Sequence, residues 1–376
     1  MKKYDNLPNP SFVIEEEKIR RNIKIFKYIK SKTNVNFLMA LKGFANYKAF
    51  SFFQDIVEGA SASSLSEAKL AKEHLTDKIH LYAPVYNEDE LKEMVRFSSH
   101  ITFNSFNQYE RFIDLTKKLN PNISVGIRVN PGYSDVEKAI YNPSDPKSRL
   151  GVPVDKMPKV LPDDIEGIHF HTLCESDDKA LFNLIKIFTE KFERYLYQIK
   201  WVNIGGGHLV THETYNVDNF IKIINDFERQ YAHLDIYVEP SAAYVWQAGV
   251  LVARVEDIVT NGGIFTAILN VSFTAHMPDT LEMPYKPKVI NEKCNGKFVY
   301  RFGGNSCLAG DYIDGFKFDT KLNVGDLIVF CDMIHYTTVK TTFFNGIKHP
   351  SIGLLRSDGK FEVFRKFGYE SYKNKL

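Results

Sequence analysis

The sequence predicts an α/β fold in which a (β/α)8 barrel of parallel strands is followed by a smaller β-domain. From about residue 15 to residue 240, short apolar runs alternate with longer amphipathic segments rich in charge, the pattern of repeated strand–helix units. Eight apolar runs can be counted, the number of strands in a barrel of this type. After about residue 250, strand-like runs follow one another without such helical segments, which indicates a separate domain made of sheet.

The strand candidates of the barrel are short, and several are apolar almost throughout, as expected where both faces of a parallel strand are buried. In chain order they are residues 35–42, 55–60, 79–84, 100–105, 124–131, 167–173, 201–205 and 236–240. The segments between them have the apolar spacing of amphipathic helices. These are residues 15–32, 66–74, 88–97, 107–119, 178–199 and 217–231.

A doubly wound nucleotide-binding sheet is the competing architecture. It requires a glycine fingerprint directly after its first strand. Here the first strand candidate runs into Ala-Leu-Lys-Gly-Phe at residues 40–44, which is not that fingerprint. The barrel is therefore preferred.

The second domain is predicted to be a β-sandwich or β-barrel. Its strand candidates are residues 251–260, 265–272, 297–302, 327–330 and 354–364. An extended segment at residues 11–14 precedes the first helix and is expected to pair into this domain. We therefore expect residues 15–250 to form the barrel domain, and residues 1–14 with 251–376 to form the β-domain.

Composition restricts the class of protein. With 376 residues, 44% of them hydrophobic, and a net charge of +2, the chain has material for a large core and no basic tract that would bind a nucleic acid polymer. The four cysteines are widely spaced, so no metal site is expected. We find no signal-peptide core and no run long enough to span a membrane, which predicts a cytoplasmic protein with free thiols.

Chemically distinctive residues follow four of the predicted barrel strands. These are Lys42, the pair His169 and His171, the run Gly205-Gly206-Gly207, and Glu239. Singly, none is specific, since a lysine there is usually a solvated strand end and a glycine run is usually a flexible turn. Their joint occurrence is informative because functional groups of a barrel gather where its strands end.

Together these residues meet the requirements of pyridoxal phosphate. The cofactor needs a lysine whose neutral amine forms a Schiff base, a role for Lys42. Its phosphate needs unhindered backbone N–H groups, which the glycine run supplies. An acid, here Glu239, keeps the pyridine nitrogen protonated so that the ring withdraws electrons. The flat imidazole of His171 can stack on the ring.

Seven motifs strengthen this interpretation, and they occur along nearly the whole chain. They are LMALKGFAN around Lys42, SRLGV at 148–152, GIHFHTLCES at 167–176, WVNIGGGHLVT at 201–211, AHMPDTLEMPY at 275–285, GGNSCLAGD at 303–311 and IHYTTVKTTFFNG at 334–346. In these motifs the chain resembles the fold-III pyridoxal-phosphate decarboxylases, and most closely the carboxynorspermidine/carboxyspermidine decarboxylase family.

The resemblance implies roles for particular residues. Lys42 is the Schiff-base lysine, His171 stacks on the ring, and Glu239 holds the pyridine nitrogen. The glycine run (Gly205, Gly206, Gly207) and Tyr336 bind the phosphate. For Arg128 two readings stay open, charge support beside the cofactor and an ion pair at the barrel rim.

The resemblance also implies an active site shared between two subunits. Cys307 lies in the motif that related decarboxylases present across a homodimer interface, where the cysteine steers protonation of the carbanion; a buried apolar thiol is the alternative. Asp311 is expected to contact the substrate amine. His276 and Asp279, together with Glu239, complete the expected substrate contacts.

The implied reaction removes the α-carboxylate of a substrate with a 3-amino-3-carboxypropyl group, as in polyamine and spermidine biosynthesis. Two positions depart from the family pattern, because Ala242 and Asn270 stand where the family favours carboxylates. Both changes remove negative charge from a site for a polycation. A second substrate class, a carboxy-aminopropylated peptide-nucleotide of the microcin C type, therefore stays open.

Three further interpretations remain. An alanine-racemase-like enzyme shares the barrel and the cofactor but lacks the Cys307 motif. A non-catalytic cofactor carrier of the small barrel type lacks the C-terminal β-domain, which this chain has. An inactive relative of the decarboxylases is compatible with Ala242 and Asn270.

Overall fold

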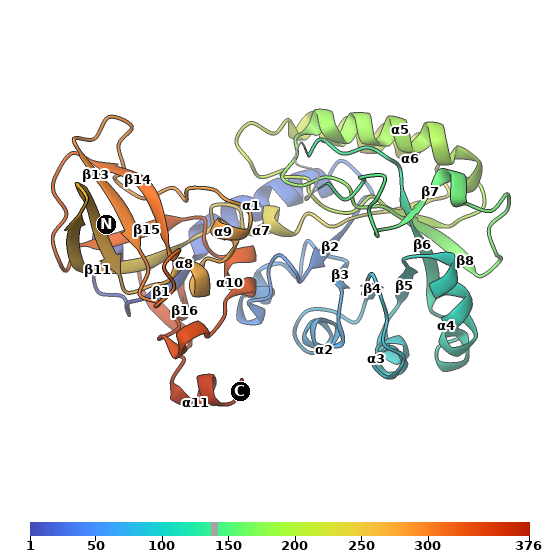
Figure 1. Cartoon of the computed structure of the whole chain (residues 1–376). Helices are drawn as coiled ribbons and strands as arrows, with labels where there is room; N and C mark the ends of the chain where they lie inside the picture. The colour runs from blue at the N-terminus through green and yellow to red at the C-terminus, as the bar shows by residue number, and fades with distance from the viewer. Residues whose placement is uncertain (137–141) are drawn as a thin grey trace. The chain divides into compact units, whose positions relative to one another are not determined.

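The computed structural model describes residues 1–136 and 142–376 (Figure 1). The chain divides into two compact units. The first comprises Met1–Arg21 and Val245–Leu376, and the second comprises Asn22–Tyr244. Each unit has its own sheet, so the two are described separately.

The second unit is a closed barrel of eight parallel strands, as the sequence predicted. The strands are β2 (Asn36–Ala40), β3 (Gly59–Ala62), β4 (Ile79–Tyr82), β5 (His100–Phe103), β6 (Ser124–Asn130), β8 (Ile165–His169), β9 (Trp201–Asn203) and β10 (Asp235–Val238). Each pairs with the next, and β10 closes the barrel on β2 through the partners Tyr237 and Asn36. All eight carboxyl ends therefore lie at one end of the barrel.

Six longer helices precede or follow these strands at the predicted places. They are α1 (Glu16–Lys30), α2 (Leu65–His74), α3 (Glu88–Met94), α4 (Phe106–Leu119), α5 (Asp178–Leu196) and α6 (Val217–Gln230). Serine side chains cap the starts of α2 and α4, since Ser64 and Ser105 each accept a hydrogen bond from the backbone N–H three residues on. Among the described helices none is long and apolar enough to cross a membrane.

One detail of the barrel differs from the prediction, and one short element was not predicted. The strand expected at residues 55–60 lies instead at β3, because the apolar residues before it form a buried turn in which Ile56 N–H donates to Phe53 O over 2.9 Å. Between β6 and β8 the described residues form only β7 (Val152–Pro153) and the 3-10 turn Val154–Lys156.

At the amino end of the barrel, aromatic rings fill the interior. Trp201 lies against Gly126 and Gly167, where any Cβ atom would collide with the indole ring. Beside it, the rings of His80 and His100 stack with their centroids 3.8 Å apart. This layer packs the barrel and places two ionisable groups in a core position.

Acidification is expected to destabilise the barrel through these histidines. Burial lowers the pKa of His100 to about 4, and burial lowers the pKa of His80 well below 6.5. Between pH 6.5 and pH 4 the unfolded chain therefore binds more protons than the folded one, so the free energy of unfolding falls as the pH falls. His100 alone contributes on the order of 2 kcal/mol to this loss at pH 5.

The test is chemical denaturation at pH 7.5 and pH 5. The denaturation midpoint of the wild type should fall on acidification, and His100→Phe, which keeps an aromatic ring but cannot ionise, should fall less. An equal fall in both proteins would show that His100 does not carry the effect.

The first unit is a mixed sheet in the order β14-β13-β12-β11-β1-β16-β17, with β15 also paired to β11. Its strands are β1 (Ser11–Glu15), β11 (Gly249–Asn261), β12 (Ile264–Leu269), β13 (Phe298–Gly303), β14 (Tyr312–Phe318), β15 (Leu327–Cys331), β16 (Ser351–Leu355) and β17 (Phe361–Arg365). Strand β1 pairs with both β11 and β16, which confirms that residues 11–14 join this sheet.

Several elements of this unit were not predicted. The strand expected at residues 354–364 is the hairpin of β16 and β17, which turns where Arg356 N–H donates to Lys360 O over 2.8 Å. Strand β14 was missed. Short helices occur where none was expected: α8 (Phe273–His276), α9 (Asp279–Glu282), α10 (Tyr336–Lys340) and α11 (Tyr369–Lys373).

Candidate active site

The strand ends of the barrel bring the predicted residues together. Lys42 lies two residues after β2, His171 two residues after β8, and Glu239 directly after β10. They line one small cavity, together with other residues from neighbouring strand ends: Ala40, Ser61, Ser63, Tyr82, Arg128 and His169.

Lys42 has the environment of a reactive amine. Its Nζ lies 3.4 Å from His171 Nε2. Burial lowers the pKa of Lys42, Glu239 opposes this shift, and the nearby Arg128 adds to it. A lysine with a lowered pKa supplies more of the neutral form that attacks a carbonyl carbon.

His171 is fixed as a neutral ring in one tautomer. Its Nδ1 accepts a hydrogen bond of 2.8 Å from Gly206 N–H, so the ring proton lies on Nε2, which faces Lys42. Burial lowers the pKa of His171 well below 6.5, and the charges of Lys42 and Arg128 act in the same direction. The ring is thus held in a set orientation beside the amine.

Glu239 is buried and held by Asn203, a residue that the sequence analysis did not single out. Asn203 Nδ2 donates to Glu239 Oε1 over 2.8 Å, and Asn203 Oδ1 accepts from Gly205 N–H over 2.9 Å. Glu239 N–H in turn donates to Gly205 O over 2.7 Å. The last residue of β9 thereby ties the carboxylate to the glycine run.

The glycine run forms a close-fitting loop. Gly205 and Gly207 have φ values of +73° and +89°, and a Cβ atom at Gly206 would collide with Glu239 O. Gly205 and Gly206 donate their N–H groups to Asn203 and His171. Within the described residues, only the Gly207 N–H of this run has no protein acceptor.

Arg128 is buried inside the cavity. Its guanidinium lies over the ring of Tyr82, 4.5 Å from the centroid, and it donates to His171 O over 3.0 Å. Burial lowers the pKa of Arg128, and the nearby Tyr82 and Glu239 oppose this shift. Both readings of Arg128, charge support beside the cofactor and an ion pair at the rim, stay predictions.

His169 is a further cavity residue to which the sequence analysis assigned no role. It is 2% exposed, and neither ring nitrogen has a hydrogen-bond partner among the described residues. Its ring meets Tyr82 edge-on, with centroids 5.1 Å apart. The only signal in the sequence was its place at the end of a strand.

The other predicted site residues lie in the first unit, on its short helices and one loop. Asp311 is 4% exposed, and its carboxylate accepts hydrogen bonds from Thr274 N–H over 3.0 Å, Ser306 N–H over 3.2 Å and Ser306 Oγ over 2.5 Å. In the same loop Cys307 N–H donates to Asn345 Oδ1 over 2.9 Å, and the Cys307 thiol is exposed rather than buried.

Asp279 and His276 are both buried in this unit. Asp279 Oδ2 accepts from Tyr285 OH over 2.8 Å and from Thr337 Oγ1 over 2.9 Å, whereas Asp279 Oδ1 has no partner in the described residues. His276 is fully buried, and its Nδ1 accepts from Ser272 N–H over 3.1 Å. Asp279 is thus tied to α10, the helix that begins with the predicted phosphate ligand Tyr336.

The two positions that depart from the family pattern have different surroundings. Ala242 lies in α7 (Ser241–Val245), three residues after Glu239. Asn270 accepts from Arg254 N–H over 2.9 Å and donates to Asn9 Oδ1 over 2.6 Å. The Asn270 side chain is therefore occupied by bonds within its own unit.

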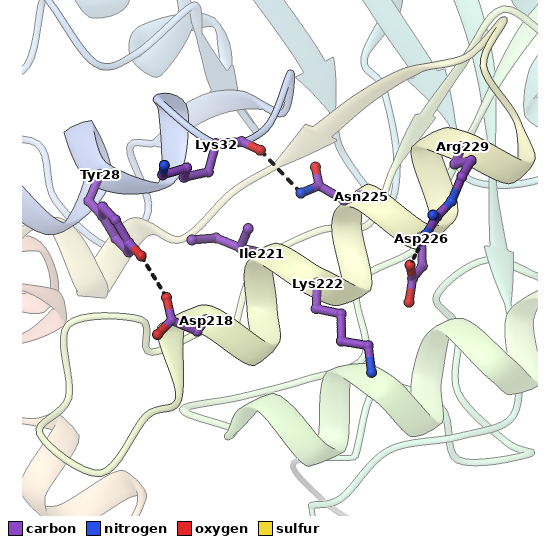
Figure 2. A pocket seen from close by; sticks show the side chains of 8 residues that line it. All are labelled: Tyr28, Lys32, Asp218, Ile221, Lys222, Asn225, Asp226 and Arg229. Atoms are coloured by element: carbon purple, nitrogen blue, oxygen red, sulfur yellow. Dashed lines mark hydrogen bonds and ion pairs between the residues drawn. The ribbon is translucent and has the colours of Figure 1, made fainter.

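A separate surface groove lies between α1 and α6 (Figure 2). It shares no residue with the cavity at the strand ends. Its polar groups bind one another: Tyr28 OH donates to Asp218 over 2.8 Å, and Asn225 donates to Lys32 O over 3.1 Å. This groove offers no set of catalytic groups.

The residues of the strand-end cavity fit pyridoxal phosphate. They provide an amine with a lowered pKa, a carboxylate held in place and an oriented imidazole, and the neighbouring loop has glycines at positions where an added Cβ atom would collide with the backbone. A parallel barrel with this set at its strand ends defines the class of fold-III pyridoxal-phosphate enzymes.

Comparison with known proteins gives the family. Residues 12–334 match the family described as "Pyridoxal-dependent decarboxylase, C-terminal sheet domain". The chain is 46% identical to a carboxyaminopropylagmatine decarboxylase of Synechocystis sp. over 99% of this chain and 96% of that protein. It is 40% identical to a carboxynorspermidine/carboxyspermidine decarboxylase of Campylobacter jejuni over 98% of each.

Solved structures agree. The crystal structure of Campylobacter jejuni carboxynorspermidine decarboxylase complexed with norspermidine superposes with a TM-score of 0.90 at 39% identity, covering 98% of this chain and 100% of that one. Helicobacter pylori diaminopimelate decarboxylase shares the fold, with a TM-score of 0.81 at 17% identity, covering 100% of this chain and 99% of that one. The chain belongs to the pyridoxal-dependent decarboxylases and, among them, to the carboxynorspermidine/carboxyspermidine decarboxylase family. It is a pyridoxal-phosphate-dependent carboxy-lyase.

Proposed function

We propose that this enzyme removes the α-carboxylate of an amine that carries a 3-amino-3-carboxypropyl group, leaving an aminopropyl group. The observation that carries the proposal is the Lys42 amine, with its lowered pKa, 3.4 Å from His171 in a cavity that also holds Glu239. The names of the two relatives above support this substrate class.

The chain's own residues divide the work. Lys42 would hold the cofactor covalently through its side-chain amine. Glu239, oriented by Asn203, would hold a proton at the pyridine nitrogen, His171 would lie beside the ring, and the Gly207 N–H would bind the phosphate. Bound pyridoxal phosphate supplies the electron sink that stabilises negative charge at Cα when carbon dioxide leaves.

We further propose a homodimer in which residues of the β-domain complete the partner's barrel site. The exposed Cys307 thiol supplies the proton at Cα, and Tyr336 adds a phosphate contact. The unpaired Asp279 Oδ1 accepts from the substrate amine. Asp311 has three hydrogen bonds inside its own loop, which supports a role in holding that loop in shape. Residues 15–250 form the cofactor domain of this assignment, and residues 1–14 with 251–376 form the other.

For the distal end of the substrate we propose a guanidinium, as in carboxyaminopropylagmatine. Ala242 leaves the site without a carboxylate that the family favours. A guanidinium is more weakly hydrated than an ammonium group. Its binding free energy therefore suffers less from the loss of hydration when no carboxylate contacts it in the site. The relative that shares 46% identity carries the name of this substrate.

The test is kcat/KM for carbon dioxide release from carboxyaminopropylagmatine, carboxynorspermidine, carboxyspermidine and a nucleotide-bearing analogue. Carboxyaminopropylagmatine should be the best substrate. Ala242→Glu should raise kcat/KM for carboxynorspermidine by about 10-fold, the effect of one added charge-assisted contact. Asn270→Asp is the matched control and should give no gain, because Asn270 is bound to Arg254 and Asn9.

Other results would replace the proposal. Efficient turnover of carboxynorspermidine by the wild type would assign that substrate instead. Faster turnover of the nucleotide-bearing analogue would favour the peptide-nucleotide class, and loss of optical rotation without carbon dioxide would favour a racemase.

A further inference from the structure

Among the residues that line the strand-end cavity, His169 is the one whose fully buried side-chain nitrogen or oxygen atoms have no hydrogen-bond partner in the described part of the chain. Lys42 faces His171, Glu239 accepts from Asn203, and Arg128 donates to His171 O. His169 lines the same cavity and is 2% exposed, yet both of its ring nitrogens are unpaired within the described residues. A buried polar group is unfavourable without a partner, so the partner is expected to come from what fills the cavity.

The state of the ring defines what kind of partner it needs. Burial lowers the pKa of His169 well below 6.5, and the charges of Arg128 and Lys42 lower it further. The ring is therefore neutral at physiological pH and has one N–H donor. The cationic guanidinium of Arg128 beside it favours an electron-rich oxygen as the acceptor.

The arrangement of the other groups shows which oxygen this is. The ring of pyridoxal phosphate has its reactive carbon and its nitrogen at opposite ends, and the proposed roles assign these to Lys42 and Glu239. The phosphate edge faces the glycine run after β9. The opposite edge bears the phenolic oxygen next to the reactive carbon, and it is the edge that those residues leave without a contact.

His169 is placed to serve that edge. It is the last residue of β8, His171 follows two residues later outside the strand, and both side chains line the cavity. Its ring packs edge-on against Tyr82 of β4, across the cavity from the glycine run after β9. Arg128 is a second donor in this region, and its Nη2 donates to His171 O over 3.0 Å while its guanidinium carbon lies 4.5 Å from the centroid of the Tyr82 ring.

We propose that His169 is a cofactor-binding residue that donates a hydrogen bond to the phenolic oxygen of pyridoxal phosphate. This inference rests on the cofactor site proposed above and does not depend on the identity of the substrate. The bond would hold that edge of the ring in place. It also accounts for a buried imidazole that the protein alone leaves without a partner.

The experiment compares two cofactors and three proteins. Apoenzyme of the wild type, His169→Phe and His169→Asn is titrated with pyridoxal phosphate and with 3-deoxypyridoxal phosphate, which lacks only the phenolic oxygen. The dissociation constant and the visible absorption maximum are recorded, and the thermal midpoint of each apoenzyme shows whether the variant folds.

We expect His169→Phe to weaken binding of pyridoxal phosphate by about 10- to 100-fold, the effect of losing one hydrogen bond to a charged group. Binding of the 3-deoxy cofactor should change by less than about 2-fold, since the partner oxygen is absent there. His169→Asn keeps a donor and should recover part of the affinity and the wild-type absorption maximum.

An equal loss with both cofactors would overturn the proposal, because it would show that His169 acts elsewhere. Unchanged binding of pyridoxal phosphate by His169→Phe would overturn it as well. Because the readouts are binding and spectra, a wrong substrate assignment would not affect them. Failure of the wild type to bind pyridoxal phosphate would instead refute the cofactor site itself.

Discussion

Lys42→Ala is expected to lose decarboxylase activity by at least about 1,000-fold, and its visible absorption band with it. Lys42 is the amine that lines the strand-end cavity, and burial lowers its pKa toward the neutral, nucleophilic form. Borohydride reduction of the wild type should attach the cofactor to the peptide that contains Lys42. Activity, the absorption spectrum and mass spectrometry of the reduced protein measure these effects.

The matched control is Lys42→Arg. It keeps a cation next to Glu239 but cannot form the covalent link, so it should be as inactive as Lys42→Ala. Recovery of activity in Lys42→Arg would mean that charge alone is needed at this position. If mass spectrometry found the reduced cofactor on a different lysine, the Schiff-base lysine would not be Lys42 at the end of β2.

The barrel and its cavity residues could be predicted because one physical rule connects them. Apolar runs of strand length mark most of the eight strands, β3 being displaced from its predicted place, and parallel strands of a barrel bring their carboxyl ends together. Lys42 and Glu239 follow their strands within two residues, so their positions in the chain nearly determine their positions in space. The same rule placed His171, although the orientation of its ring depends on Gly206.

The supporting residues could not be predicted, because their roles depend on partners distant in the chain. Asn203 looks like an ordinary strand residue until its amide is seen between Glu239 and Gly205. Asn270 was read as a substituted substrate contact, but its side chain is bound to Arg254 of β11 and to Asn9 in the loop before β1. Pairing of this kind is not contained in a local pattern.

The β-domain shows a second limit. Helices of four or five residues, such as α8 and α9, are too short for a 3.6-residue period to be visible. Strand β14 has Gly315 at a φ of +87° within it, which breaks its alternation. The predicted site residues of this domain therefore came from motif resemblance, and their roles need a test that involves both domains.

Mixing two inactive variants provides that test and should restore activity. If Cys307 of one subunit acts at Lys42 of its partner, Lys42→Ala and Cys307→Ala dimers are each defective at both sites. A hybrid dimer has one complete site, because the chain with Lys42 receives the Cys307 of the other chain. Equal mixing yields half hybrids, so activity should rise from near zero to about a quarter of the wild-type value.

The measurement is the carbon dioxide release rate after subunit exchange, which differently tagged chains make visible by co-purification. A mixture of Lys42→Ala with Lys42→Arg is the control and should remain inactive, because neither chain supplies the amine. Hybrid dimers that form without regaining activity would place Lys42 and Cys307 in a site built from a single chain. Cys307→Ala that is fully active before mixing would remove the thiol from the mechanism. Recovery of about a quarter of the wild-type activity requires both a dimer and a shared site. Each variant chain lacks one of the two residues, so a complete site must take Lys42 from one chain and Cys307 from the other.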